Sequence, residues 1–426
     1  MPITSIRMES HQPPLYYVLA AIVYKATAPL GSDSQFLSLR LFSVALGAAV
    51  LLAVYHLVRN VDPEHESLAL VASAGIAVVP MHIAMSAAIN NDTLAELLLL
   101  LILVQSVRAA RTGFSSRSAL TVGLFLGLAL LTKTTVYMAV AVVGLSWLCS
   151  TMRAPGAQRS SSAVRRNWIR VSAIQALQLF LPALVLTTPW LVRNLLVYGN
   201  WDLLGWVRHD SIVSGQLRSA ELLSQIGWLQ FVLQFLTTTF RSFWGQFGWM
   251  GVLIDQRLYL ALALLSTILA TGLTAFAARA WRGRAVLTAG QARALLILAA
   301  SALLTVATYL WYNTKFVQHQ GRYLFPALGP FALAAALGLR ELVGSRLARL
   351  LAVAFVLGAG LLAVAGLALG DVHVWRSVLL LAAGTFAGAL GWLPARWQWL
   401  PLAALYVAFL ALDWVCLFGF IVPALT

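Results

Sequence analysis

Charged residues are scarce in this chain of 426 residues. Only 10% of the residues are Asp, Glu, Lys or Arg, whereas 61% are apolar. Soluble domains contain about a quarter charged residues and roughly half apolar ones. So few polar side chains cannot coat the surface of a water-soluble body of this size, which excludes an ordinary cytosolic enzyme. The composition therefore predicts an integral membrane protein.

Cysteine and lysine are rare as well. The two cysteines, Cys149 and Cys416, each lie within an apolar run, which excludes a disulfide scaffold. Lys accounts for only 3 of the 29 basic residues, and the net charge of +15 comes from arginines that lie mostly between apolar runs. Arginines in such places are typical of topology signals and of contacts with anionic lipid. We therefore expect membrane lipids, and no nucleic acid, as partners.

Long uncharged runs recur along the whole chain. Each of these is long enough to cross roughly 30 Å of hydrocarbon as a helix: 41–58, 67–91, 134–152, 171–192, 258–278, 294–314, 350–370 and 377–395. Four shorter runs complete a set of about twelve transmembrane helices: 93–107, 118–132, 323–339 and 397–412. The sequence therefore predicts an all-α, polytopic membrane protein in which residues 1–426 form a single multi-spanning domain.

Arginine-rich connections indicate the orientation of these helices. By the positive-inside rule the connections within 108–117, 153–170, 279–293 and 340–349 are cytoplasmic. The opposite, external side then receives residues 31–35, 89–92, Lys133, 193–256, 313–322 and 370–375. Residues 1–35 are predicted to form an external juxtamembrane part. Its apolar segment 15–29 is short and either lies along the interface or, if it crosses, turns the N-terminus to the cytoplasm.

The long external loop 193–256 is rich in tryptophan. It contains an uncharged run, 222–240, that includes Gln and Thr. Because Trp prefers the headgroup level, this run predicts an amphipathic helix resting on the outer leaflet. The alternative is a lid that closes over a lipid-linked substrate.

Several polar groups are predicted at the external side, where placing them has a desolvation cost unless they are paired or hydrated. Asp92 directly precedes an apolar helix, which favours an N-cap and also suits a site carboxylate beside free backbone N–H groups. Lys133 and Arg193 end apolar runs and either reach the headgroups or bind a phosphate. Arg322 stands at a helix start, where the helix dipole gives a cation no benefit. Its planar donors therefore indicate an anionic partner such as phosphate.

Motifs for other chemistry are missing. The sequence has no paired Cys/His metal spacing, no Gly-rich phosphate loop, no HExxH and no nucleophile elbow. No cofactor is therefore identified, and a divalent metal stays open. The intramembrane acids Glu96 and Asp413 are isolated in sequence, and we expect each to be partnered near a helix end.

The order and spacing of the polar blocks carry a resemblance to a known superfamily. The blocks are 9–17, 90–93, 127–133, 189–199, 242–249 and 320–326. With them the chain resembles the polytopic glycosyltransferases of the C superfamily, especially bacterial family 39-like proteins related to protein mannosyltransferases and aminoarabinose transferases. The resemblance implies a multi-pass protein of the bacterial cytoplasmic (inner) membrane. Its external, periplasmic face would transfer a hexose or pentose from a polyprenyl-phosphate donor to a glycan, lipid or protein acceptor.

Such a reaction needs a carboxylate that orients or deprotonates the acceptor and cations that stabilise the departing phosphate. In the family the principal carboxylate belongs to an acidic pair upstream of the block that resembles 9–17. Only eight residues precede Glu9, so the sequence contains neither that pair nor the usual first membrane helix. Either Met1 is an internal start, or the protein is a diverged or inactive relative.

Within the residues present, Glu9 and Asp92 are the candidate catalytic carboxylates. The candidate substrate-binding residues are His11, Gln12, Asn91, Lys133, Arg193, His319, Arg322 and Tyr323. A basic external cavity also fits a lipid-linked sugar transporter or flippase, although no duplicated halves are visible. A noncatalytic membrane subunit that has lost its base is the third possibility.

Overall fold

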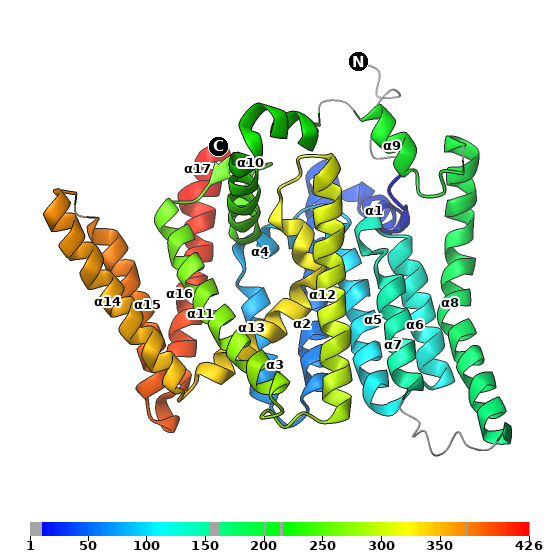
Figure 1. Ribbon diagram of the computed structural model, residues 1–426. Coiled ribbons are helices and arrows are strands. Elements are labelled where there is room, and N and C mark those ends of the chain that lie inside the picture. Colours follow the sequence, from blue (N-terminus) through cyan, green and yellow to red (C-terminus); the bar gives the residue numbers. More distant parts are fainter. Residues whose placement is uncertain (1–10, 153–161, 200, 214–215, 372, 426) are drawn as a thin grey trace.

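Helices make up nearly all of the protein in the computed structural model, which describes residues 11–152, 162–199, 201–213, 216–371 and 373–425 (Figure 1). Glu9, one of the two predicted catalytic carboxylates, lies outside the described residues. The helices of the first half are α1 (Leu15–Ala26), α2 (Ser32–Val61), α3 (Glu66–Ala77), α4 (Pro80–Ser86), α5 (Asp92–Thr112), α6 (Ser116–Leu130), α7 (Ala139–Thr151) and α8 (Ser162–Tyr198).

The second half continues in the same way. Its helices are α9 (Trp206–Ile212), α10 (Ser219–Trp244), α11 (Gln256–Trp281), α12 (Ala289–Lys315), α13 (Leu328–Leu342), α14 (Arg346–Leu369), α15 (Val374–Trp392), α16 (Trp399–Val415) and α17 (Val422–Leu425). Short helical turns are η2 (Ala28–Leu30), η3 (Thr134–Val136), η5 (Gly321–Ala327), η6 (Ala395–Trp397) and the π-helical η7 (Cys416–Ile421). Strands β1 (Gln246–Phe247) and β2 (Val252–Leu253) pair antiparallel.

Every apolar run predicted to span the membrane is helical. Ten helical segments are long and apolar enough to cross, and α3 with α4 makes an eleventh if this pair, bent by 71°, is one span. The remaining run is α6, which has 15 residues and is apolar but shorter. The prediction of an all-α polytopic membrane protein is confirmed, and the count of about twelve spans holds if α6 crosses.

Helix α1 is too short to span a bilayer. Its 12 residues rise about 18 Å at 1.5 Å per residue, against roughly 30 Å of hydrocarbon. The backbone N–H of Leu15 donates to the Leu131 carbonyl at 2.9 Å, which docks α1 at the end of α6. Figure 1 shows α1 almost end-on near the upper end of the bundle. These features agree with the interfacial interpretation of segment 15–29.

The connections segregate to two ends of the bundle. Lys133 follows α6 at the upper end in Figure 1, together with α1, α4, α9 and the α14–α15 turn; we name this the Lys133 end. The α2–α3, α5–α6, α11–α12 and α13–α14 connections lie at the lower end, named the Arg340 end. The described connections that were predicted to be external and cytoplasmic are separated in this way.

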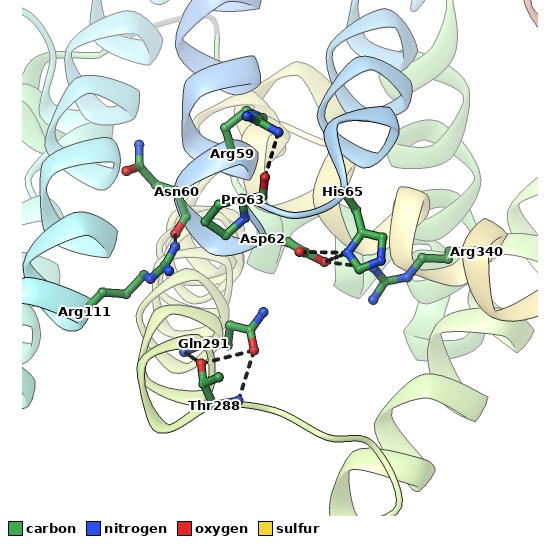
Figure 2. Close-up of polar contacts among 9 residues, drawn as sticks. All are labelled: Arg59, Asn60, Asp62, Pro63, His65, Arg111, Thr288, Gln291 and Arg340. Carbon is green, nitrogen blue, oxygen red and sulfur yellow. Dashed lines mark hydrogen bonds and ion pairs between the residues drawn. The ribbon is translucent and has the colours of Figure 1, made fainter.

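A polar network ties several helices together at the Arg340 end (Figure 2). The carboxylate of Asp62, 7% exposed, accepts hydrogen bonds from His65 Nδ1 at 2.9 Å and from Arg340 Nη1 at 2.9 Å. Arg111 Nη1 donates to the Asn60 carbonyl at 2.9 Å and so joins α5 to α2. Burial raises the pKa of Asp62, but the donors His65 and Arg340 outweigh it and hold that pKa below its usual value.

Helix α10 has two limbs rather than the single interfacial helix predicted for 222–240. Gly227 has φ 75°, a left-handed conformation that interrupts the helix. The first limb crosses the Lys133 end, and the second descends into the bundle (Figure 1). There Gly321 of η5 packs directly on the α10 backbone, because a Cβ at this position would lie 2.3 Å from the Thr239 carbonyl oxygen.

Candidate functional site

Lys133 and Asp92 form an ion pair at the Lys133 end. Lys133 Nζ lies 2.5 Å from Asp92 Oδ1, and the two side chains are 11% and 27% exposed. The turn that carries Lys133 is held by Asn91, whose Nδ2 donates to the Thr132 carbonyl at 3.2 Å. This buried amide thereby holds the turn that carries Lys133 near the start of α5, and the prediction that Asn91 binds substrate stays a prediction.

Asp92 is not the N-cap that the sequence predicted. The cap position is Asn91, which makes no side-chain capping bond, and Asp92 is the first residue of α5. The Asn90 side chain accepts the backbone N–H of Asp92 at 2.8 Å. The Asp92 carboxylate therefore faces Lys133 and does not cap its own helix.

Tyr323 lies between two cations. Its ring centroid is 6.0 Å from Lys133 Nζ and 5.4 Å from Arg322 Cζ. The Arg322 guanidinium reaches Met85 of α4, with Nη1 3.5 Å from the sulfur. We name Asp92, Lys133, Arg322 and Tyr323 the Lys133 cluster. The structure thus brings together four of the predicted site residues, from α5, the α6–α7 connection and η5.

The Lys133 cluster carries an excess of positive charge. Asp92 is paired with Lys133, whereas Arg322 forms no ion pair within the part of the chain that the structure describes. Its Nε is buried and has no hydrogen-bond partner there. A half-buried guanidinium whose donors are not satisfied favours an anionic ligand, because a phosphate can accept two of its N–H groups.

Trp249 was not predicted as a site residue, yet it flanks Arg322. Arg322 Cζ lies 5.8 Å from the Trp249 ring, which is 92% exposed. Gly248, Trp249 and Met250 are all left-handed, with φ values of 55°, 52° and 75°. For the two residues with side chains this conformation is strained, and such strain is often found at ligand sites. Trp249 ends the block 242–249 that contributes to the resemblance, but the proximity of Trp249 to Arg322 depends on the fold.

A second polar pair lies deeper in the bundle. His82 Nε2 and Glu96 Oε2 are 3.2 Å apart, and both side chains are 5% exposed. The His82 ring also contacts Phe325, with centroids 5.5 Å apart. Glu96 therefore has the partner that was expected. Asp413 does not: both of its carboxylate oxygens are buried and have no hydrogen-bond partner among the described residues.

His11 and Arg193 join contacts of the α8–α9 region. The His11 ring is 4.4 Å from the His209 ring, and Gly205 packs against its Cβ. Gln12 follows His11 and is half-buried. Arg193 Nη1 donates a hydrogen bond to Tyr198 Oη at 3.0 Å. One donor of the Arg193 guanidinium is therefore used by another residue of α8. Their assignment as substrate-binding residues therefore stays a prediction.

His319 is packed into an aromatic environment. Its ring is 5.4 Å from Phe231 and 5.1 Å from Phe235, both on α10, and the residue is 4% exposed. Burial lowers the pKa of the His319 imidazole below its ordinary value. Both ring nitrogens are buried without a hydrogen-bond partner in the described chain, and the role of His319 in substrate binding stays a prediction.

An apolar cavity of about 440 Å³ lies between α3, α10, α11, α13 and α16. Its wall includes Phe243 and Trp244 of α10 and extends along α13 from Leu328 to Leu339. Phe325, three residues after Arg322, contacts Phe243 with ring centroids 5.7 Å apart. The segment that carries Arg322 therefore leads into the wall of an apolar space. In the described residues, no group of three or more His, Cys, Asp or Glu side chains is placed to hold a metal ion.

Residues 4–329 match the model of the family described as "Predicted membrane protein (DUF2142)". The chain belongs to this family. No curated protein matches it. Among solved structures it is similar to ArnT from Cupriavidus metallidurans in the apo state, at 14% identity and a TM-score of 0.46, over 95% of this chain and 62% of that chain.

Two further solved structures are similar to this member of the family. ArnT bound to undecaprenyl phosphate matches at 14% identity and a TM-score of 0.46, over 95% of this chain and 66% of that chain. The third structure is the archaeal oligosaccharyltransferase AglB from Archaeoglobus fulgidus, in complex with an inhibitory peptide and a dolichol-phosphate. It matches at 14% identity and a TM-score of 0.43, over 91% of this chain and 49% of that chain. The chain spans less than two thirds of the length of each of these structures.

Proposed function

We propose that this protein transfers a sugar from a polyprenyl-phosphate donor to an acceptor at the Lys133 end, on the external face of a bacterial inner membrane. One observation carries the proposal: Arg322, unpaired by any acid of the described chain, lies next to the Lys133–Asp92 ion pair across Tyr323. This arrangement supplies the cations and the carboxylate that the reaction needs.

The donor phosphate binds between Arg322 and Lys133 in this proposal. Arg322 offers paired N–H donors, and Lys133 offers a point charge on a flexible stem. When Lys133 turns to the phosphate, Asp92 loses its partner and its carboxylate becomes free to accept the proton of the acceptor. Both cations then stabilise the charge that develops on the phosphate as the bond to the sugar breaks. The apolar cavity beside Phe243 and Leu328 suits the isoprenoid chain.

Replacing Arg322 tests the proposal. Undecaprenyl phosphate is the probe, and its binding to the purified full chain is measured with radiolabelled lipid. We expect Arg322→Ala to bind this lipid at least about tenfold more weakly and to lose sugar transfer, because a charge-assisted bidentate contact is removed. Insertion into the membrane should be unchanged.

Arg282→Ala is the matched control, because Arg282 is an exposed arginine that follows α11 at the opposite end. It should bind and transfer like the wild type. Unchanged transfer by Arg322→Ala would reject the proposal. Movement of a labelled lipid-linked sugar across liposome membranes without modification of an acceptor would instead favour the transporter alternative.

A further inference from the structure

A second cavity, of about 640 Å³, lies on another face of α10. It is bounded by α10, α11, α14 and α15, and its wall includes Phe240, Leu264, Leu362, Leu380, Arg241 and Arg376. The α10 residues that pack on η5, Thr239 and Phe243, do not line it. Helix α10 therefore separates this cavity from the Lys133 cluster.

The cavity is polar at one end and apolar below. Arg241 lies beside Tyr259 in the first turn of α11, with its Cζ 5.3 Å from that ring, and Arg376 is in the first turn of α15. Both of these helices begin toward the Lys133 end (Figure 1). Leu264 lies about two turns into α11, and Leu362 lies about two turns before the end of α14. The order of cations above and aliphatic side chains below matches a membrane lipid in the leaflet at that end.

The two arginines have no acidic partner in the described chain. Arg241 Cζ is 5.3 Å from the Tyr259 ring, and Arg376 Cζ is 5.6 Å from the Trp375 ring. Two acids near the starts of α11 and α15 make other contacts and form no ion pair with these arginines. Asp255 accepts the backbone N–H of Arg257 at 2.7 Å as the cap of α11, and Asp371 lies 3.4 Å from His373. The positive charge over the cavity is thus available to an anion.

The attachment of the α14–α15 hairpin keeps the cavity open at the Lys133 end. These helices pack closely on each other and join the body through a cluster near the Arg340 end that includes Leu342, Ala348 and Leu390. In Figure 1 the hairpin leans away from the bundle toward its upper end. Space between α11 and the hairpin is therefore a consequence of how the hairpin is anchored.

We infer that this cavity binds a phosphate-bearing lipid of the leaflet at the Lys133 end, with its headgroup between Arg241 and Arg376 and its chains along Leu264 and Leu362. A soluble anion would leave the aliphatic wall exposed, and a neutral lipid would leave both guanidinium groups without a counter-charge. The site is distinct from that of the proposed sugar donor, and its test does not depend on sugar transfer.

Native mass spectrometry of the full chain tests this site. The protein is released from nanodiscs that contain equal amounts of phosphatidylglycerol and phosphatidylcholine. We expect the wild type to retain phosphatidylglycerol and the Arg241→Gln/Arg376→Gln variant to retain roughly tenfold less, because each cation near the surface contributes separately. The matched control, Arg282→Gln/Arg284→Gln, removes two exposed arginines at the Arg340 end and should behave like the wild type.

Other results would overturn the inference. These are equal retention of the two lipids, unchanged retention by the double variant, displacement of the lipid by inorganic phosphate alone, and a second copy of the chain in place of lipid. Arg376→Gln alone guards against misfolding, because Arg376 is exposed. Its melting temperature should match that of the wild type while its lipid retention falls, and full retention would count against the site.

Discussion

At the scale of single residues, the Lys133–Asp92 ion pair has to serve both stability and the proposed chemistry. The pair is mostly buried, with side chains 11% and 27% exposed, so neither charge is fully hydrated. Removing one partner leaves the other charge without compensation, whereas removing both takes the charges away together. This difference separates a structural role from a chemical one.

We predict that Asp92→Asn and Lys133→Gln each lower the free energy of unfolding by about 1–3 kcal/mol, because a partly buried charge loses its partner. The Asp92→Asn/Lys133→Gln variant should recover most of that loss. All three variants should lose sugar transfer, since the carboxylate or the cation is missing. Thermal unfolding in detergent and a transfer assay measure the two effects, and normal transfer by the double variant would show that the pair is only structural.

The sequence predicted the kinds of residue at this site better than their roles. Lys133 and Arg322 were selected as cations near the membrane surface, and Tyr323 as the residue that follows Arg322; in the structure both cations lie within 6.0 Å of the Tyr323 ring centroid. Asn91 and His319 were also selected, and the structure shows contacts that the sequence did not predict, a hydrogen bond to the Thr132 carbonyl and aromatic contacts with α10. Which way a polar side chain turns depends on the neighbouring helix, and that neighbour is not visible from local sequence.

At the scale of elements, the contact between η5 and α10 positions the arginine. Gly321 immediately precedes Arg322, and its N–H donates to Ser242 Oγ at 2.7 Å. A Cβ at Gly321 would lie 2.3 Å from the Thr239 carbonyl oxygen and 2.5 Å from the Phe243 nitrogen, both of them backbone atoms of α10. Only glycine allows η5 to approach the helix so closely.

We therefore predict that Gly321→Ala separates η5 from α10. The expected cost is on the order of 1–3 kcal/mol of unfolding free energy, because backbone atoms must move. Binding of undecaprenyl phosphate should weaken as well, since Arg322 is displaced. Gly144→Ala is the control: no atom lies within 4 Å of the added Cβ, and alanine favours the helix by roughly 0.5–1 kcal/mol. A Gly321→Ala protein as stable as the wild type would contradict the prediction.

At the scale of the whole molecule, ion pairs join described segments at both ends of the bundle, Asp62–Arg340 at one end and Lys133–Asp92 at the other. Asp62, in the α2–α3 turn, accepts a hydrogen bond from Arg340 near the end of α13 (Figure 2). The two residues are far apart in sequence and meet only in the folded bundle. Arg322, at the other end, has no comparable acid in the described chain.

The network at the Arg340 end predicts a pH dependence of stability. The pKa of Asp62 is lowered in the folded protein, so its contribution is present above the ordinary value of 3.8 and is lost as the pH falls through the folded-state pKa. Asp62→Asn should lower the free energy of unfolding by about 1–2 kcal/mol at neutral pH, since its donors are half exposed. It should also flatten the fall in melting temperature as the pH drops below about pH 4.

Glu64→Gln is the matched control for this experiment, because Glu64 is an exposed acid of the same turn. Its melting temperature should follow that of the wild type across the whole pH range. If Asp62→Asn and the wild type lost stability in parallel on acidification, another group would be responsible for the pH dependence.

The sequence alone determined the class of the protein and the positions of its spans. Hydrophobic runs of fixed length must be helical in a bilayer, because backbone groups there have no water to bond, and arginines separate the connections into two sets. These rules act locally along the chain. Only the tertiary structure decided which polar residues meet, since Asp92, Lys133 and Arg322 come from segments far apart in sequence. Their proximity, and the cavity left beside the α14–α15 hairpin, follow from helix packing across the whole bundle.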